Sequence, residues 1–435
     1  MFHPANPARR PEERLPPFLS QKLRFWSLAA MLSLAYVHAY NLHPHYLQPW
    51  TEVAEPLTPA TWVQYFLANG LLRFRIPLLF AISGYLFAHR AGTAPHLARV
   101  WHRVRTLGVP FLAWSALGMG LAWALEQFPG TRQLVLAAGL DRFGPDAPLV
   151  SAYSPEQVLL CWLLVPVPFQ LWFIRSLLVY SLCYPWLRAA VDRVPRLYFG
   201  LVALLWLTNW HLPVVPLLEG SGLLFFALGV WLRGRHFDAL AVPGWFRPGR
   251  FLALWLALLV GKTSLAFYPQ VLPAPALVLA LLHKAAEAVG VLTLWFGADG
   301  LVRAAMRRAW FVWLTGFSFF LYAAQEPLLS YATQGALRWW PEWPLLVFGL
   351  LPAAVLAALV LAAALLRRVA PAPYGVLTGG RGPARPAATA GFSGPREAQR
   401  EGGELNKRLP GAEVRKKNGA SQLAQPGRKV RRPGR

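Results

Sequence analysis

Cysteine is scarce in this chain of 435 residues, which contains only Cys161 and Cys183. Both lie in apolar surroundings, and neither a CxxC pair nor a histidine–cysteine spacing accompanies them. We therefore expect no disulfide framework and no metal site. The chain also lacks a GxxxxGKS or GxxxxGKT phosphate-binding loop, which argues against ATP-driven transport. No internal repeat of about 20–50 residues is visible, so a repeat architecture is not predicted.

Acidic residues are also few: 19 Asp and Glu face 43 Lys and Arg, which gives a net charge of +24. Such an excess can indicate nucleic-acid binding. Here, however, the basic residues cluster between apolar runs and in the C-terminal tail, 56% of the residues are hydrophobic, and 20 are Trp. This composition is too apolar for an ordinary soluble domain. It predicts a membrane protein with basic cytosolic loops and no nucleic-acid partner.

What the sequence does contain is a series of apolar runs, most of them long enough to cross a bilayer as helices. The first begins near Leu23 and lacks an obvious cleavage site, so we interpret it as a retained signal anchor. We predict an all-α polytopic membrane bundle of about ten transmembrane helices. The predicted spans are 23–43, 73–89, 104–125, 169–190, 197–214, 220–234, 249–268, 275–297, 309–332 and 343–367. Between them we expect an interfacial helix at 62–72, a long loop at 126–155 and a short re-entrant segment at 157–168.

The distribution of Lys and Arg over the loops predicts the topology. Basic residues concentrate before the first span, after the second, in every second loop thereafter, and in the C-terminal tail. Both termini are therefore predicted to be cytosolic. We predict a cytosolic N-terminal segment at 1–22, a membrane domain at 23–381 and a disordered basic tail at 382–435. Anionic membrane lipid would attract this tail, although the simpler interpretation of a solvated tail with topological value alone stays open.

Polar residues in four predicted spans lie at a similar depth near the outer membrane face. An ionisable group inside an apolar span is costly and is a candidate for function. His38, near the outer end of the first span, is suited to act as a general base, and neighbouring arginines could bind a sugar or stabilise an oxyanion. A helix–helix hydrogen bond of His38 and a structural or snorkelling ion pair of the others remain alternatives. The predicted substrate-binding residues are Arg73, Arg75, Arg175, Gln325 and Glu326.

A second group of basic residues lies on the predicted cytosolic side. His102, Arg103 and Arg105 precede the third span, and arginine is well suited to binding phosphate. Arg24 lies about 21 Å from His38 along the first helix and on the same face. We predict that these four residues bind the phosphates of a nucleotide-type donor such as acyl-CoA. The alternative for the loop residues is an ordinary positive-inside loop.

Several segments, in order along the chain, resemble those of acyltransferase family 3, whose members O-acylate cell-surface glycans and related molecules. The first span, an apolar run that ends in His38, resembles the opening helix of the family. The other segments that carry the resemblance are RIPLLFAISGYLF (75–87), RVRTLGVPFLAW (103–114), LWFIRSLLVY (171–180), FSFFLYAAQEPLL (317–329) and LTGGR (377–381). Together they cover roughly residues 20–381.

The resemblance implies a bundle of ten or so helices in the bacterial inner membrane, with His38 as the catalytic residue. It implies acyl-CoA from the cytosol as co-substrate, with acetyl-CoA as the expected donor and no permanently bound cofactor. The acceptor would be a hydroxyl of a carbohydrate, a glycolipid or a related cell-envelope molecule.

Two positions depart from the family pattern. Where the family often has Arg eleven positions before the histidine, this chain has Ser27, and Arg24 is the nearest basic substitute on the same face. Gln325 stands where the family often has His; glutamine can hydrogen-bond a carbonyl but cannot shuttle a proton. Polar residues in a membrane cavity would also suit a transporter or flippase of a glycan or lipid precursor. Against that alternative, the chain shows no internal symmetry of the kind found in transporters.

Overall fold

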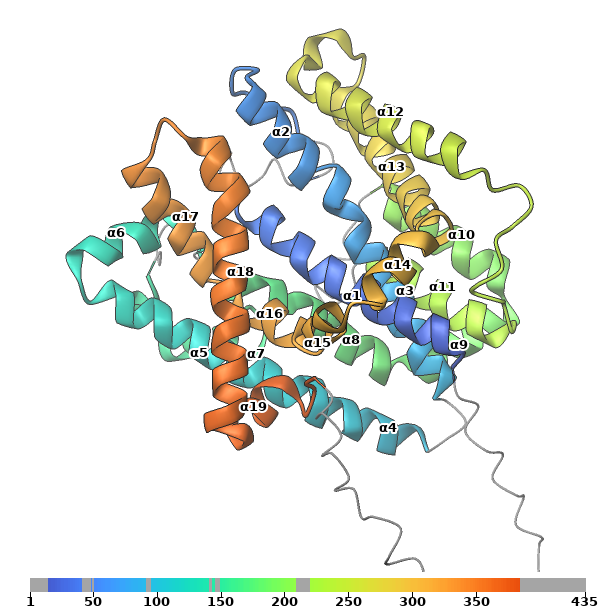
Figure 1. Cartoon of the computed structure of the whole chain (residues 1–435), viewed down its shortest axis with the longest axis horizontal. Helices are drawn as coiled ribbons and strands as arrows, with labels where there is room; N and C mark the ends of the chain where they lie inside the picture. The colour runs from blue at the N-terminus through green and yellow to red at the C-terminus, as the bar shows by residue number, and fades with distance from the viewer. Residues whose placement is uncertain are drawn as a thin grey trace, which may run out of the picture. The chain divides into compact units, whose positions relative to one another are not determined.

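Every regular element in the described part of the chain is helical. The computed structural model describes residues 15–40, 48, 51–90, 95–140, 143–144, 149–208 and 220–383. The predicted tail at 382–435 lies outside the described residues from position 384 onward, as does most of the predicted segment at 1–22. The all-α helix bundle expected from the sequence is therefore what the chain forms (Figure 1).

The first half of the chain forms helices that carry the candidate site residues up to Arg175. These are α1 (Pro17–His38), α2 (Pro59–Ala68), η2 (Leu71–Phe74), α3 (Arg75–His89), α4 (His96–Arg103), η3 (Val104–Gly108), α5 (Val109–Glu126), α6 (Pro129–Ala138), η4 (Val150–Ala152), α7 (Pro155–Leu163), η5 (Phe169–Leu171), α8 (Trp172–Leu182) and α9 (Tyr184–Arg193).

The second half continues in the same way and contains the longest single helix. Its helices are α10 (Pro195–Leu207), α11 (Gly220–Gly234), α12 (Pro248–Phe267), η6 (Pro269–Val271), α13 (Pro275–Gly297), α14 (Asp299–Met306), α15 (Ala309–Thr315), α16 (Ser318–Ala324), α17 (Leu328–Trp339), α18 (Pro344–Val369) and α19 (Pro371–Thr378). Proline opens α12, α13 and α18, because the first helical position needs no N–H donor and its φ suits the ring.

Five helical runs of the described chain are long and apolar enough to cross a membrane. They are Pro59–His89, His96–Glu126, Pro248–Phe267, Pro275–Gly297 and Pro344–Val369. Shorter apolar helices occupy Phe169–Leu182, Pro195–Leu207 and Gly220–Gly234. The predicted spans at 220–234 and 275–297 coincide with α11 and α13. The outer faces of α12 and α18 expose leucines such as Leu254, Leu361 and Leu365, as expected of helices that contact lipid tails.

Three predicted segments differ from the structure. The predicted loop at 126–155 contains α6, which ends at Gly139 in the left-handed conformation that favours glycine. The predicted span at 169–190 is interrupted at Cys183, because Pro185 follows and cannot donate to the preceding turn. The predicted span at 309–332 is divided into α15, α16 and the start of α17, with Gly316 and Pro327 at the breaks. Proline and glycine inside apolar runs therefore changed the element boundaries.

Helix α1 is the element around which the others are arranged (Figure 1). It packs against α3, α14, α16 and α18, among others. Its buried side chains lie on several faces and include Leu23, Leu28, Ala35 and Val37, each at most 6% exposed. A helix that is apolar all round is buried in the interior of its protein. The end of α1 thus places His38 inside the bundle.

Helices α3 and α11 approach each other closely through two glycines. A Cβ atom on Gly84 would lie 2.0 Å from the carbonyl oxygen of Phe226, and one on Gly229 would lie 2.1 Å from that of Ala81. Small residues at such contacts let two helix backbones approach within a membrane. The glycine of the SGY segment, Gly84, is therefore needed for the close packing of α3 against α11.

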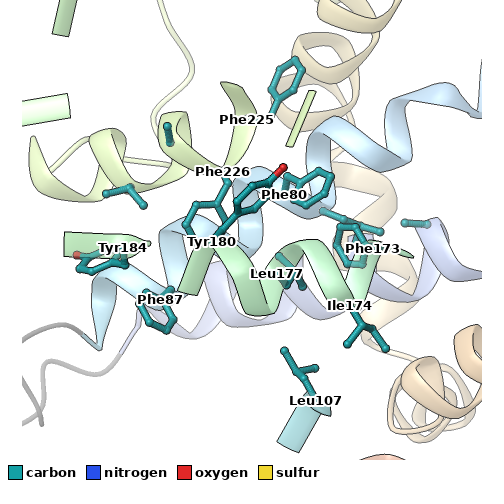
Figure 2. Close-up of a cluster of buried hydrophobic side chains, with 14 of the residues drawn as sticks. Phe80, Phe87, Leu107, Phe173, Ile174, Leu177, Tyr180, Tyr184, Phe225 and Phe226 are labelled. Atoms are coloured by element: carbon teal, nitrogen blue, oxygen red, sulfur yellow. The ribbon is translucent and has the colours of Figure 1, made fainter. Parts of the chain in front are cut away.

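A cluster of aromatic side chains fills the space between α3, α8 and α11. Figure 2 shows Phe80, Tyr180 and Phe226 together at its centre. The ring centroids of Phe80 and Tyr180 are 5.6 Å apart, and those of Tyr180 and Phe226 are 5.5 Å apart, which is the range of favourable aromatic pairs. This packing positions α3, whose first residue is Arg75, beside α8.

Candidate active site

His38 and Glu326 form a buried pair at the centre of the candidate site. His38 is the last residue of α1, and Glu326 lies in the break between α16 and α17. The distance from His38 Nδ1 to Glu326 Oε1 is 3.2 Å, and the two side chains are 4% and 0% exposed. The hydroxyl of Ser330 donates a hydrogen bond of 2.7 Å to Glu326 Oε2. Because α1 and the break belong to distant parts of the sequence, only the tertiary fold creates this pair.

The second ring nitrogen of His38, Nε2, is not engaged by the described part of the chain. No described residue donates to or accepts from Nε2 of His38 in a hydrogen bond. Phe169 lies beside the ring, with a centroid separation of 4.7 Å. When a carboxylate faces Nδ1, it holds the proton there and leaves Nε2 as the acceptor. The arrangement is the one that a histidine general base needs.

Gln325 is the neighbour of Glu326 and is completely buried. Neither Oε1 nor Nε2 of its amide has a hydrogen-bond partner among the described residues. Buried amides are nearly always paired, so both groups of this amide retain their hydrogen-bonding capacity. The amide can donate to a carbonyl oxygen of a bound substrate.

Arg73 and Arg75 lie next, where η2 passes into α3. Arg73 is half-buried, whereas Arg75 is 4% exposed. Nη1 of Arg75 donates to the carbonyl oxygen of Leu72 over 2.9 Å. Both guanidinium groups interact electrostatically with His38. The structure therefore brings together five of the residues that the sequence nominated: His38, Arg73, Arg75, Gln325 and Glu326.

Arg175 does not join this group. It lies in α8, is half-buried, and donates a hydrogen bond from Nη1 to the carbonyl oxygen of Leu164 just after α7. No ion pair connects it to a carboxylate of the described chain. Its observed contact fastens α8 to the end of α7, and a role in binding substrate stays a prediction.

The residues predicted to bind the donor lie on α1, on α4 and on η3. The side chain of Arg24 is exposed near the start of α1. His102 and Arg105 are also exposed, and the Arg105 guanidinium lies 5.0 Å from the centre of the Trp101 ring. Arg103 is half-buried, with its guanidinium 5.2 Å from the Phe87 ring centre. The π-helical turn η3 separates Arg103 from α5, and such turns often occur at functional sites.

The LTGGR segment places Arg381 beside η3. Nη1 of Arg381 donates a hydrogen bond of 2.6 Å to the carbonyl oxygen of Thr106 in η3. Gly379 has φ +60°, and a Cβ there would lie 2.2 Å from the same oxygen, so glycine is required. Burial and the charge of Arg90 lower the pKa of Arg381 to about 10, so its guanidinium is charged at neutral pH. The segment was noted in the sequence, but no role was assigned to its arginine.

A second set of buried charges lies on α12 and α13 and was missed in the sequence. Lys262, His283, Lys284 and Glu287 are each at most 7% exposed. His283 Nε2 lies 3.3 Å from Glu287 Oε1, and Lys284 Nζ lies 3.8 Å from Glu287 Oε2. The signal was available, because charged residues within apolar spans face an interior or a wet cavity. The HKAAE stretch of the eighth predicted span contains three of them.

The comparison with known proteins assigns the class. Residues 30–363 match the acyltransferase domain of acyltransferase family 3. This match spans most of the chain, so the protein belongs to that family and is a multi-pass membrane O-acyltransferase. The family resemblance stated from the sequence segments is confirmed.

A curated relative extends the comparison. The chain is 29% identical over 369 residues to the succinoglycan biosynthesis protein ExoH of Rhizobium meliloti (strain 1021). The alignment covers 80% of this chain and 90% of that protein. No solved structure matches the chain.

Proposed function

We propose that this protein transfers an acyl group from cytosolic acyl-CoA to a hydroxyl of a cell-envelope carbohydrate or glycolipid, with His38 as general base. One observation carries the proposal: a buried histidine faces a buried carboxylate through Nδ1 and keeps Nε2 unpaired among the described residues. A dyad of this kind removes a proton from a hydroxyl nucleophile.

The chemistry requires one proton to move twice. His38 Nε2 takes the proton of the acceptor hydroxyl while its oxygen forms a bond to the thioester carbonyl carbon. The tetrahedral intermediate then collapses, the carbon–sulfur bond breaks, and the imidazolium returns the proton to the CoA sulfur. The Gln325 amide, which is buried and has no hydrogen-bond partner among the described residues, would stabilise the developing oxyanion. Glu326 holds the imidazolium in orientation and offsets its charge.

The donor would enter from the inner side. Arg103 interacts electrostatically with Arg90 and Arg381, and arginine clusters bind phosphates by charge-assisted hydrogen bonds. Arg24, His102 and Arg105 would contribute at the periphery of this group. Acetyl-CoA is the expected donor, and the cytosolic position of both termini is the topology that delivers it.

The acceptor class is supported by the relative. That protein is named for the biosynthesis of succinoglycan, a glycan by its name. The outer depth predicted for His38 suits an acceptor on the external side of the membrane. The alternative of a glycan or lipid-precursor transporter has no comparable support, because the matched family is one of acyltransferases.

The deciding experiment compares two histidine–glutamate pairs of the same protein. His38→Gln should lower kcat for acyl transfer by about 10²–10⁴-fold, the contribution of a general base. His283→Gln is the matched variant, because His283 is equally buried and faces Glu287 at 3.3 Å. Acyl-CoA consumption and glycan O-acylation would be measured with purified protein in lipid nanodiscs. A large loss of kcat in His283→Gln with full activity in His38→Gln would assign the base to the other pair.

A further inference from the structure

We propose that Lys262 and Arg75 form a binding site for an oxyanion, a carboxylate or phosphate group carried by one of the two substrates, beside His38. The inference rests on the proposed function and adds the chemistry of a group that the substrate must contain. Both cations are buried and lack a carboxylate partner among the described residues.

Lys262 is completely buried in α12. Its Nζ donates a hydrogen bond of 2.7 Å to the backbone carbonyl oxygen of Asn69 and lies 4.9 Å from the centre of the Tyr65 ring. No described carboxylate lies within 4.0 Å of it. An ammonium group has three donors, so an aromatic face and one neutral carbonyl do not supply all that a buried lysine requires.

Arg75 is likewise a buried cation without a carboxylate partner among the described residues. Its guanidinium is 4% exposed, and the hydrogen bond to the Leu72 carbonyl is made by Nη1. Nε has no partner among the described residues, and no described carboxylate forms an ion pair with the group. A buried charge without a counter-ion is strongly unfavourable, so a ligand that supplies negative charge would stabilise both cations.

The carboxylate of Glu287 does not offset this excess. It interacts electrostatically with both Arg75 and Lys262, but its two oxygens contact His283 and Lys284. Arg73 adds a further positive charge that acts on the same two cations. The region between η2, α12 and α13 therefore has positive charge in excess in the part of the chain that the structure describes.

The segment that Lys262 contacts leads to Arg75 and so toward the proposed reaction centre. Lys262 binds Asn69, which immediately precedes η2, and Arg75 follows η2. Arg75 also interacts electrostatically with His38. The hydroxyl of Thr263, adjacent to Lys262, is buried and has no hydrogen-bond partner among the described residues. An oxyanion bound here would orient its parent molecule toward Nε2 of His38.

The first test measures binding without turnover. Thermal unfolding of the protein in nanodiscs would be followed with succinate, glucuronate or glycerol phosphate, and with neutral methyl glucoside. At least one oxyanion should raise Tm in a saturable way, whereas the neutral sugar should not. Lys262→Met should weaken that oxyanion's apparent affinity by about tenfold, the strength of a hydrogen bond to a charged group. Absence of any oxyanion effect, or an equal effect in Lys262→Met, overturns the proposal.

Two further variants separate binding from folding. Lys22→Met is the matched control, because Lys22 is 1% exposed, lies over the Trp295 ring at 4.5 Å and pairs with Asp299 instead. It should leave oxyanion affinity unchanged. Thr263→Val removes an unsatisfied hydroxyl with little change of shape, so it should not destabilise the free protein. A loss of oxyanion affinity in this well-folded variant supports the site, and a loss in Lys22→Met that equals that of Lys262→Met contradicts it.

Kinetics then identify which substrate carries the group. Acetyl-CoA and succinyl-CoA would be compared with a neutral acceptor, and neutral, glucuronate-containing and phosphate-linked acceptors would be compared with acetyl-CoA. One charged substrate should show a kcat/KM about tenfold above its neutral counterpart, an advantage that Lys262→Met removes. A higher kcat/KM for succinyl-CoA than for acetyl-CoA would contradict the expectation that acetyl-CoA is the donor. No advantage for any charged substrate overturns the inference.

The two proposals fail in different ways. Oxyanion stabilisation should persist in His38→Ala, which lacks the proposed base but retains Lys262 and Arg75. A wild-type protein that binds oxyanions but transfers no acyl group contradicts the proposed function alone. A protein that transfers acyl groups with His38 but binds no oxyanion contradicts this inference alone.

Discussion

At the scale of single residues, Glu326 reaches His38 from a distant part of the sequence, whereas Glu287 faces His283 within one helix. Oε1 of Glu326 faces His38, and its Oε2 accepts a hydrogen bond from Ser330 one helical turn further on. The carboxylate is thereby held at a buried position where its charge is not screened by water. A carboxylate at this position favours the tautomer of His38 that has its proton on Nδ1.

Replacing Glu326 with Gln should impair catalysis while substrate binding is retained. The amide can donate to Nδ1 and so favour the tautomer with its proton on Nε2, which cannot act as base. We expect kcat to fall by about 10²–10⁴-fold with little change in KM, by analogy with carboxylate-to-amide changes in other histidine dyads. Steady-state kinetics in nanodiscs would measure both constants.

Ser330→Ala is the control for this prediction. It removes the hydrogen bond to Oε2 but leaves the charge in place, so kcat should fall by about tenfold at most. Wild-type kcat in Glu326→Gln would show that the carboxylate does not orient the base.

At the scale of elements, the contact between α3 and α11 fixes the position of α3, the helix that begins at Arg75. Gly84 and Gly229 allow the two backbones to approach, and the aromatic cluster of Figure 2 fills the space beside them. Because Arg75 is the first residue of α3, a displacement of this helix would move its guanidinium away from His38. The packing of one helix pair is therefore linked to the site.

Gly84→Ala should destabilise the protein through this contact. The new Cβ would meet the Phe226 carbonyl oxygen at 2.0 Å, and overpacking of this kind costs about 1–3 kcal/mol. A lower Tm in nanodiscs, together with reduced acyl transfer, is the expected result.

Gly120→Ala is the matched control, because no atom of the described chain lies within 4 Å of a Cβ at this position in α5. At an exposed position within a helix, replacing Gly with Ala should raise the free energy of unfolding by about 0.5–1 kcal/mol. Equal effects of the two substitutions would show that the α3–α11 contact is not as close as described.

At the scale of the whole molecule, exposed tryptophans gather near the ends of the helices. Trp101, Trp186 and Trp310 are exposed on α4, α9 and α15, and Trp340 and Trp343 are exposed between α17 and α18. Tryptophan is enriched at both membrane interfaces. By the predicted topology, the first three lie on the cytosolic side and the last two on the external side.

Thiol labelling tests this topology. In a background with Cys161→Ala and Cys183→Ala, a cysteine would replace either Trp340 or Trp186, whose side chains are 58% and 71% exposed. An impermeant maleimide should label Trp340→Cys in intact cells and Trp186→Cys only after permeabilisation. The reverse pattern would invert the orientation and would place the proposed donor site on the outside.

The sequence by itself determined the class of this protein, because composition and the spacing of apolar runs reflect the bilayer rather than any particular fold. It also determined the family and the candidate residues His38, Arg73, Arg75, Gln325 and Glu326, since polar groups inside apolar runs are conspicuous. The predicted limits of α11 and α13 agree with the structure for the same reason.

Only the tertiary structure decided which of these residues meet. His38 and Glu326 are separated by most of the chain, and their contact depends on how α1 packs against α16. Arg175 looked equivalent from its depth, but its hydrogen bond goes to Leu164, because depth along a helix does not specify the face. Lys262 of α12 hydrogen-bonds Asn69, which immediately precedes η2, and α13 packs against η2. Long-range packing of this kind has no periodic signal in the sequence.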